Sequence, residues 1–508
     1  MAKLERLHGL NRGQTIRVNI ESLAPGGDGV GHYDGLAVFV SRVAPGDEVD
    51  VELFDVRKSF ARGKLLEIIR PSEIRIEPRC MYFDRCGGCQ WQHISYDEQL
   101  KAKHEIIVQA VRHIEGVSVE EGLRAPNDFD YRNKAQFPVK QSKRGKLRVG
   151  YFEHSSHQIV DIDECVVQPE TLDLVLRELK YLVVEHKISA YTEDTHEGLL
   201  RHICARQSFF NNEVLVTLVV NLQNQAALKE ARIKKTFDTI AKELMENVKE
   251  VKGVCLNFNA ARGNKIFGDR TIPLQGVSEI EEVLQSKRDD RPQQLKDGIK
   301  FRMSSQSFFQ INTEQAANLF DEVYDQLAMV KERLGKPLRV LDVYAGVGAI
   351  ALWVSSLAEN VVAIEEYEDA VQDGHATVEN NGVGNITFEE GSAETILQRM
   401  ADENYECDVV ILDPPRKGAS AEVLSALIKL APKFVIYVSC NPQTLGRDLK
   451  ILQDGVLQED DGKQVYTGYK TQRVKPVDLF PQTYHVESVA TLERFVDDGA
   501  VGNLEEIG

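Results

Sequence analysis

The chain has 508 residues, a formal net charge of −18, 42% hydrophobic residues and 28% charged residues. This length is too great for one hydrophobic core, so a multidomain protein of two to four domains is expected. No apolar run reaches membrane-spanning length and the first residues lack the apolar core of a signal peptide, so we expect a cytoplasmic enzyme with no membrane partner.

Residues 10–72 predict a small OB-like β-barrel. The alternating segments T-I-R-V-N-I, L-A-V-F-V and E-V-D-V-E-L are separated by P-G-G-D-G and A-P-G-D, which are strong turn signals. Barrels of this type often hold single-stranded nucleic acid, although a purely structural barrel is the alternative.

Three cysteines follow the barrel in the array C-x5-C-x2-C, at Cys80, Cys86 and Cys89. Three grouped thiols need a fourth ligand, and Cys165 is the best candidate because polar residues and a turn surround it. Four cysteines suit structural zinc or an iron–sulphur cluster, and spacing alone leaves both open.

Residues 73–297 predict a central α+β domain, with helices over 97–111 and 171–182 and strands over 214–221 and 253–259. A basic run carries Arg132, Lys134, Lys140, Lys143, Arg144, Lys146 and Arg148 without an intervening acid. This run is either a solvated hairpin or a surface for the phosphates of RNA. The polar stretch 285–298 is expected to be a surface connection.

Residues 298–496 predict a doubly wound α/β domain of the Rossmann-like type, followed by an acidic tail over 497–508. Strands are expected near Val340–Val343, Val361–Ile364, Ile386–Phe388, Val409–Leu412 and Phe434–Val438, with helices between most of them. The alternating segment 484–495 predicts a last strand at or near the sheet edge. A helix is expected to begin near Thr313, with Thr313 as its N-cap and Gln310 just outside it.

Polar and glycine residues follow several of these strands. Gly346 and Gly348 let the backbone approach a ligand, and Glu365 is placed to bind ribose hydroxyls. The segment G-V-G-A-I-A also satisfies a dinucleotide fingerprint, which makes a dehydrogenase the rival interpretation. The later phrases D-P-P-R, with Asp413, and S-C-N-P, with Cys440, have no evident use in hydride transfer.

Cys440 is the strongest single candidate for catalysis. Asn441 is a plausible N-cap and Pro442 suits a first helical turn, so the thiol is expected at a helix amino terminus. The helix dipole there lowers the pKa of a thiol and favours thiolate. A buried structural cysteine is the commoner outcome for a single strand-end cysteine, but the other ligand-facing strand ends beside it favour a nucleophile.

The combination of S-F-F-Q-I-N, D-V-Y-A-G-V-G, D-P-P-R-K-G, S-C-N-P-Q-T and H-V-E-S-V resembles the RNA uracil-C5 methyltransferase family. The resemblance implies a TRAM barrel, a 4Fe–4S cluster on the four cysteines and S-adenosylmethionine as methyl donor. By resemblance, Cys440 is the nucleophile that adds to uracil C6 and Glu487 is the general base. The residues implied in cofactor binding are Gln310, Tyr344, Glu365 and Asp413.

The barrel favours 23S rRNA as the RNA partner, and no obligate protein partner is evident. A tRNA uracil-C5 methyltransferase and an RNA cytosine-C5 methyltransferase are the chemical alternatives. The cytosine enzymes commonly carry a cysteine in the loop where this chain has Asp413. A non-catalytic RNA-binding module would explain the barrel and the basic run but not Cys440 with Glu487.

Overall fold

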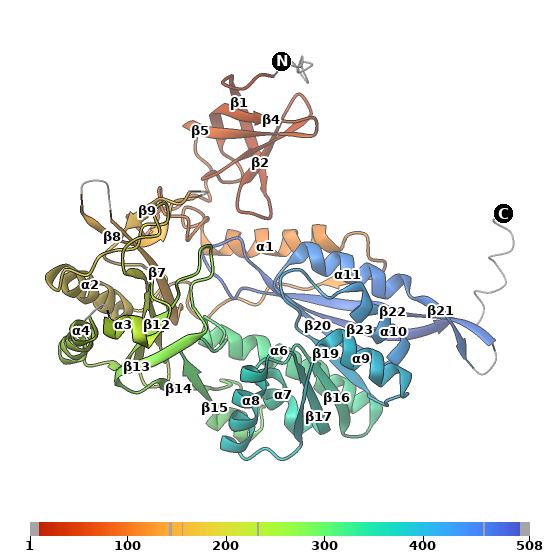
Figure 1. The fold of residues 1–508 in the computed structure, drawn as a ribbon. Helices are drawn as coiled ribbons and strands as arrows, with labels where there is room; N and C mark the ends of the chain where they lie inside the picture. The colour runs from red at the N-terminus through yellow and green to blue at the C-terminus, as the bar shows by residue number, and fades with distance from the viewer. Residues whose placement is uncertain (1–9, 142–144, 155, 231–232, 461–462, 498–508) are drawn as a thin grey trace.

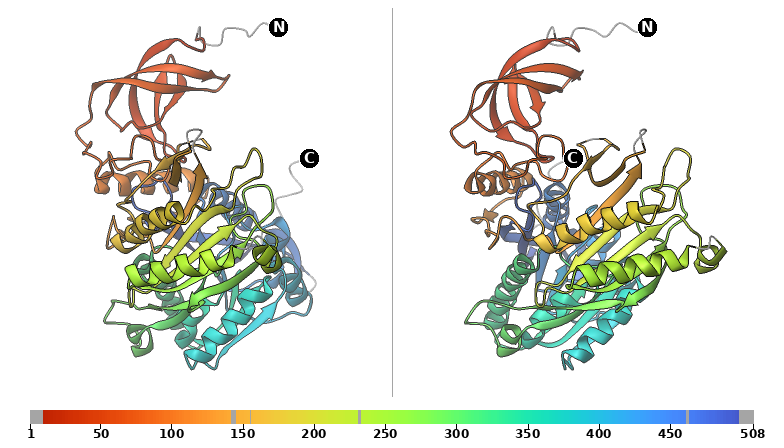
Figure 2. Two further views of the ribbon diagram at one scale, coloured as in Figure 1. Left: turned by 60° about the vertical axis from the view of Figure 1, so that its left-hand side comes forward. Right: turned by 90° about the vertical axis from the view of Figure 1, so that its left-hand side faces the viewer.

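The computed structural model describes residues 10–141, 145–154, 156–230, 233–460 and 463–497. A small barrel stands at one end of the molecule, and two α/β parts lie side by side beneath it (Figure 1). Seen from two further sides, the barrel projects from the rest and rests above helix α1, Tyr96–Val111 (Figure 2). No helix among the described residues is both long and apolar enough to cross a membrane.

The predicted barrel is confirmed. Its strands are β1 (Thr15–Leu23), β2 (Gly29–Tyr33), β3 (Leu36–Val40), β4 (Glu48–Val56) and β5 (Phe60–Arg70), closed in the order β1-β2-β3-β5-β4. Every second residue of T-I-R-V-N-I is buried, so Ile16, Val18 and Ile20 fill the barrel interior.

Helix α1 and the short strand β6 (Ser118–Val119) lie against the carboxyl-terminal sheet. α1 packs on helix α11 (Pro442–Asp454), and β6 pairs with strand β22 (Lys463–Val477). On the buried side of α1, Lys103 donates a hydrogen bond of 2.6 Å to Asp478, and both side chains are almost fully buried. The segment that contains α1 and β6 therefore packs against the carboxyl-terminal sheet, although it precedes the central sheet in the sequence.

The central sheet has seven strands in the order β13-β12-β11-β10-β7-β8-β9. Its strands are β7 (Lys134–Gln141), β8 (Leu147–Phe152), β9 (Ile159–Asp161), β10 (Leu200–Gln207), β11 (Val214–Val220), β12 (Val251–Phe258) and β13 (Arg270–Gly276); the accompanying helices are α2 (Glu170–Glu185), α3 (Gln225–Glu230) and α4 (Lys234–Asn247). The basic run forms the β7–β8 hairpin, in which Lys140 pairs with Arg148. Lys143 and Arg144 lie outside the described residues.

The stretch 285–298 lies partly at the surface, as its polarity predicted, with residues 287–290 exposed, but it also buries three of its side chains. It joins strands β14 (Glu279–Leu284) and β15 (Ile299–Ser304) and contains helix α5 (Gln293–Asp297). Arg291 is buried because its guanidinium group pairs with Asp321 at 2.8 Å, and Leu295 is buried in the core. A matched ion pair and hydrogen bonds allow the charged side chain of Arg291 to be buried while residues 287–290 stay exposed.

The carboxyl-terminal sheet has the strand order β18-β17-β16-β19-β20-β23-β22-β21, with β6 beside β22. Its other strands are β16 (Leu338–Val343), β17 (Ala358–Glu365), β18 (Ile386–Glu390), β19 (Val409–Leu412), β20 (Phe434–Ser439), β21 (Val456–Asp460) and β23 (Glu487–Asp497). Strand β23, expected at or near the edge, is not the edge strand, because β20 and β22 pair with its two sides; β22, followed by the short β21 and β6, lies beyond it. Its polar residues are buried with partners, as when Thr491 donates a hydrogen bond to Gln326.

Helices cover both faces of this sheet, as expected of a doubly wound fold. One face carries α6 (Thr313–Leu334), α7 (Ala349–Val354), the short 3-10 helix η1 (Ser355–Leu357) and α8 (Glu368–Asn380); the other carries α9 (Ala393–Asp402), α10 (Ala421–Leu430), α11 and α1. The N-cap of α6 is Asn312, whose side chain accepts a hydrogen bond from the N–H of Gln315, rather than Thr313. Alternate residues of β16 face the two cores, with Val340 on one side and Leu341 on the other.

Candidate active site

The strand order of the carboxyl-terminal sheet reverses between β16 and β19. At such a switch point the loops after the two strands diverge and leave a crevice at their carboxyl ends. A cavity of about 60 Å³ lies there, lined by Gln310, Tyr344, Gly346, Asp342 and Asp413. The fold therefore brings together three of the four residues predicted to bind the cofactor.

The fourth, Glu365, fixes the turn that forms this cavity. Its Oε2 accepts a hydrogen bond of 2.8 Å from the N–H of Gly346, and its Oε1 accepts from the N–H groups of Glu366 and Tyr367 at 2.9 and 3.0 Å. Gly346 and Gly348 both have positive φ, and a Cβ at Gly348 would lie 2.8 Å from the Phe388 ring. The carboxylate thus holds two neighbouring strand ends at a fixed separation.

Asp342 belongs to this cavity and was missed from the sequence. Its Oδ2 accepts a hydrogen bond of 3.0 Å from the N–H of Ala351, but its buried Oδ1 has no hydrogen-bond partner. Burial, with Asp413 nearby, raises the pKa of Asp342 to about 8. An unsatisfied buried carboxyl oxygen at a cavity calls for a hydrogen-bonding partner from a ligand. Its place near the end of β16, two residues before Tyr344, was the signal in the sequence.

Cys440 and Glu487 lie opposite each other at the ends of neighbouring strands. The β20–β23 ladder pairs Ser439 with Ser488, and each candidate residue is the next one outward on its strand. Burial first, then the charge of Asp413, raises the pKa of Glu487 to about 8. Burial alone raises the pKa of Asp413 to about 7. The two carboxyl groups and the thiol form one electrostatically coupled cluster.

The predicted helix start after Cys440 is confirmed, since Asn441 is the N-cap of α11 and Pro442 its first residue. The thiolate predicted at Cys440 is not confirmed. Burial, followed by the charges of Glu487 and Asp413, raises the pKa of Cys440 to about 12. Desolvation and two carboxylates outweigh one helix end here, so the thiol is protonated in the free protein.

A second cavity, of about 240 Å³, opens beside Cys440. It is lined by Arg416, Tyr484 and His485 and by Pro25 and Gly26 of the barrel. The barrel loop is held in place because the Nε1–H of Trp91 donates a hydrogen bond of 3.0 Å to the carbonyl oxygen of Gly27. Sequence reasoning missed these lining residues, because only the fold brings the barrel loop to the thiol.

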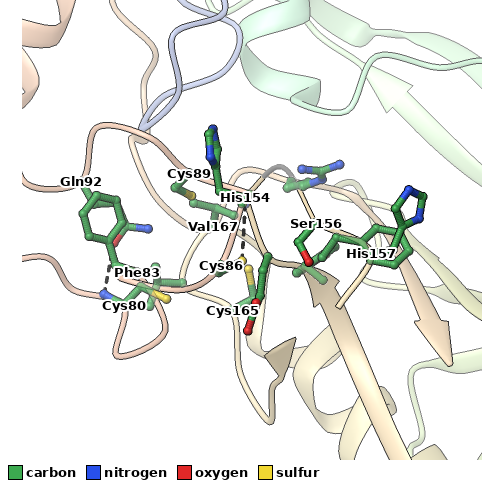
Figure 3. A pocket seen from close by; sticks show the side chains of 17 residues that line it. Cys80, Phe83, Cys86, Cys89, Gln92, His154, Ser156, His157, Cys165 and Val167 are labelled. Carbon is green, nitrogen blue, oxygen red and sulfur yellow. Dashed lines mark hydrogen bonds between the residues drawn. The ribbon is translucent and has the colours of Figure 1, made fainter. Parts of the chain in front are cut away.

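The four predicted ligand cysteines lie on one further cavity, of about 580 Å³, in the central part of the protein. Figure 3 shows Cys80, Cys86 and Cys89 coming from one loop and Cys165 from a separate segment. The N–H of Gly88 donates a hydrogen bond to Cys86 Sγ at 3.4 Å. Among the residues that the structure describes, no three His, Cys, Asp or Glu side chains form a group that could hold a metal ion.

Two family models match the chain. The model of the tRNA (uracil-5-)-methyltransferases matches residues 95–495, and that of the TRAM domain matches residues 9–66. An uncharacterized RNA methyltransferase of Gloeobacter violaceus is 39% identical over 96% of this chain and 98% of its own length. One from Halalkalibacterium halodurans is 36% identical over 95% of this chain and 98% of its own length.

A similar fold is present in a solved structure, the Pyrococcus abyssi tRNA (uracil-54, C5)-methyltransferase in complex with S-adenosyl-L-homocysteine. The two chains are 28% identical with a TM-score of 0.70, over 94% of this chain and 100% of that one.

The reversed strand order and its carboxyl-end crevice define a doubly wound α/β domain with a ligand crevice, joined to a TRAM barrel. More narrowly, the chain belongs to the tRNA (uracil-5-)-methyltransferase family, as the match over residues 95–495 shows. It is an S-adenosylmethionine-dependent RNA uracil-C5 methyltransferase.

Proposed function

We propose that the protein methylates C5 of a specific uridine in RNA through a covalent bond between Cys440 and C6 of the base, with Glu487 as the general base. The observation that carries this proposal is the opposed placement of Cys440 and Glu487 beside Asp413. Asp413 also lines the crevice at the switch point, and its charge acts on both Cys440 and Glu487.

The chemistry needs a nucleophile because uracil C5 is weakly nucleophilic. The Cys440 thiol must lose its proton, and the thiolate then forms an S–C6 bond while the C5–C6 electron pair moves into an enolate. S-adenosylmethionine supplies a methyl group that is electrophilic at carbon. After C5 is methylated, Glu487 takes the C5 proton, the C5–C6 double bond forms again and the sulphur of Cys440 leaves. The target base must be unstacked to expose C6 to the thiol.

The methyl donor is proposed to bind in the crevice between β16 and β19. Gln310, Tyr344, Glu365 and Asp413 are its proposed contacts, and the free oxygen of Asp342 adds a further hydrogen-bonding group. The cavity of about 60 Å³ is far smaller than the several hundred Å³ that drug-sized ligands occupy. The exposed Phe308 and half-buried Gln310 on the loop before α6 must therefore move when the donor enters.

Two kinds of RNA, 23S rRNA and tRNA, are candidate substrates. The prediction of 23S rRNA rests on the barrel, but the tRNA enzyme of Pyrococcus abyssi aligns with 94% of this chain. An alignment over 94% of this chain includes most of the barrel. The presence of a barrel therefore does not distinguish an rRNA substrate from a tRNA substrate. A tRNA uridine is therefore the second candidate, while family membership favours neither cytosine chemistry nor a non-catalytic module.

We also propose a 4Fe–4S cluster on Cys80, Cys86, Cys89 and Cys165. Four thiols on one cavity fit such a cluster, which takes one cysteine on each of its four iron atoms. A zinc ion would need all four sulphurs within about 4 Å of one another, given Zn–S bonds of about 2.3 Å. The cluster would tie the loop of residues 80–89 to the segment around Cys165 and support folding or RNA docking. We also propose a division into three domains, over residues 10–72, 73–297 and 298–496.

The test of function is transfer of tritiated methyl groups to unmodified 23S rRNA and to unmodified tRNA. Cys440→Ala should abolish transfer to either while S-adenosylmethionine binding persists, because the thiol acts on the base. Glu487→Gln should form the S–C6 bond but stall before elimination, which leaves a denaturation-resistant RNA–protein species. Turnover by the Cys440→Ala variant would refute the covalent mechanism, and methylated cytidine as product would refute the assignment to uridine.

A further inference from the structure

A cavity of about 470 Å³ on the central sheet has no part in the proposed reaction. Strands β7, β8 and β10 and the loop before β13 form it. Its lining includes the rings of Tyr151, Phe152, His157, Tyr191 and His202, the cations of Arg132, Lys140 and Arg201, and the loop residues Gly263, Asn264 and Ile266. Glu193 is the one acidic side chain among the described lining residues. We refer to this site as the aromatic cavity.

Two buried nitrogen atoms on its lining lack partners. Arg201 is only 3% exposed, and its guanidinium group lies 4.5 Å from the centre of the Tyr191 ring. Its Nη1 donates hydrogen bonds to the carbonyl oxygens of Asn259 and Ala261 at 2.7 and 2.6 Å, but its Nε has none. Nδ1 of His202 is likewise buried without a partner. Buried donors and acceptors in native proteins are normally satisfied, so this pair indicates a polar ligand.

The ligand that suits this lining is flat and aromatic with a hydrogen-bonding edge. Exposed Phe152 and half-buried Tyr151 offer ring surfaces for stacking. Arg201 can donate to a carbonyl or ring nitrogen, while His202 stays neutral because burial lowers its pKa to about 4. Lys140 at the strand end can contact a phosphate. Aromatic rings with a cationic border are the usual platform for an unstacked base of single-stranded nucleic acid.

The aromatic cavity is also connected to the site of methylation. Arg132 lines it, and His485 lines the cavity beside Cys440. Tyr131, next to Arg132, donates a hydrogen bond of 2.9 Å to the carbonyl oxygen of Pro481, four residues before His485. The chain segments that line the two cavities are therefore in direct contact, which allows one RNA strand to reach both.

We propose that the aromatic cavity binds a second, splayed-out nucleobase of the same RNA, near the uridine to be methylated. This inference rests on the proposed function only in taking RNA as the ligand. A base held there would fix the register of the strand, so that only a uridine at the right distance reaches Cys440. A free mononucleotide offers the same chemistry and is the alternative source of the ligand.

The experiment uses the full-length protein and a loop substitution that blocks the cavity without disturbing its floor. Asn264 is exposed and lines the cavity, so Asn264→Trp should cover it. Ala261→Trp is the matched control, because Ala261 is exposed on the same loop but is not part of the lining. The probe is a short single-stranded RNA with one uridine and a photoreactive 4-thiouridine moved from position to position. Crosslinked peptides are identified by mass spectrometry.

In wild type and Ala261→Trp, 4-thiouridine should crosslink from a single RNA position that is distinct from the target uridine. The crosslink should fall on the peptide that contains Tyr151 and Phe152 or on the peptide that contains Tyr191. Asn264→Trp should lose this crosslink and bind the RNA about tenfold more weakly, the effect expected when one base no longer stacks on the protein. S-adenosylmethionine affinity should stay the same in all three proteins. Equal crosslinking and equal RNA affinity in both tryptophan variants would overturn the proposal.

Mononucleotides separate the two sources of the ligand. If AMP, GMP, CMP or UMP binds wild type but not Asn264→Trp, while RNA crosslinks avoid the cavity, the site serves a free nucleotide and the proposal is wrong. Failure of the proposed function gives a different result. Methyl transfer would then be absent while the crosslinks at the aromatic cavity remained, and this inference would still hold.

Discussion

Glu487 and Asp413 lie on opposite sides of strand β20, and both burial and the charge of Asp413 raise the pKa of Glu487. Asp413 follows β19, Cys440 follows β20 and Glu487 begins β23, so three neighbouring strands place three ionisable groups at one edge of the sheet. Each carries a raised pKa, of about 7, 12 and 8 respectively. In the free protein at neutral pH, the proposed base and the proposed nucleophile therefore both hold protons.

The rate of methyl transfer should consequently rise with pH. Glu487 must be ionised to take the C5 proton, and its pKa of about 8 places the increase across that value. Single-turnover rates measured at saturating RNA and S-adenosylmethionine from about pH 6 to about pH 9.5 would show it. A rate that falls over this range would contradict Glu487 as base.

The same carboxyl group should make stability depend on pH. Its folded-state pKa of about 8 lies above the ordinary value of 4.5, so the folded protein keeps a proton that the unfolded chain has lost. Its contribution is therefore complete below about pH 4.5 and is lost as pH rises through about 8. Glu487→Gln removes this pH-dependent loss of stability. The melting temperature of the variant minus that of wild type should therefore increase as pH rises from about 5 to about 9. Glu422→Gln, at an exposed position on α10, is the control and should show a constant difference.

Glu365→Gln should weaken S-adenosylmethionine binding. The carboxylate accepts three backbone hydrogen bonds that hold the turn at Gly346, and a glutamine amide would direct N–H groups at one of these donors. Loss of one charge-assisted hydrogen bond corresponds to a roughly 10- to 100-fold increase in Kd. Calorimetric titration measures it, with Glu366→Gln at the exposed neighbouring position as control. Equal affinities would show that the turn does not depend on the charge.

Anaerobically purified protein should be brown, with broad visible absorption and about four iron atoms per chain. Cys89→Ser should lose the iron and the colour, because Cys89 lines the cysteine cavity. Cys407→Ser should retain both, since Cys407 does not belong to that lining. Stoichiometric zinc without iron in the wild type would refute the cluster.

The β7–β8 hairpin should contribute to the salt dependence of RNA binding. Lys140 and Arg148 pair across its two strands, so both can lie along a phosphate backbone. Replacing both by alanine should weaken binding more at low salt than at high salt, and reduce the log–log slope by roughly 0.7 to 0.9 for each phosphate that the protein no longer neutralises. Lys235→Ala with Lys242→Ala, exposed on α4, removes the same charge elsewhere. Parallel lines for wild type and the hairpin variant would mean that the hairpin faces solvent.

Local pattern was sufficient to predict the barrel, the positions of the parallel strands along the chain and the helix start at Asn441. Alternation and turn residues determine such elements over a few residues, and the sequence contains them directly. The protonation state of Cys440 was predicted wrongly, because it depends on desolvation and on Asp413 and Glu487, which only the folded sheet brings near. The position of strand β23 inside the sheet was not evident for a similar reason: its polar residues find partners on other elements, as Thr491 does with Gln326 of α6.

The barrel loop at Pro25 and Gly26 has a consequence for how the protein is made. The wall of the cavity beside Cys440 combines this loop with Tyr484 and His485, which the ribosome adds only after almost all of the intervening chain. The barrel can close early in synthesis, since its strands are adjacent in sequence, yet the chamber for the base stays open on one side until synthesis is nearly over. A nascent chain therefore lacks the complete chamber until Tyr484 and His485 have been added, and a prematurely terminated chain never completes it.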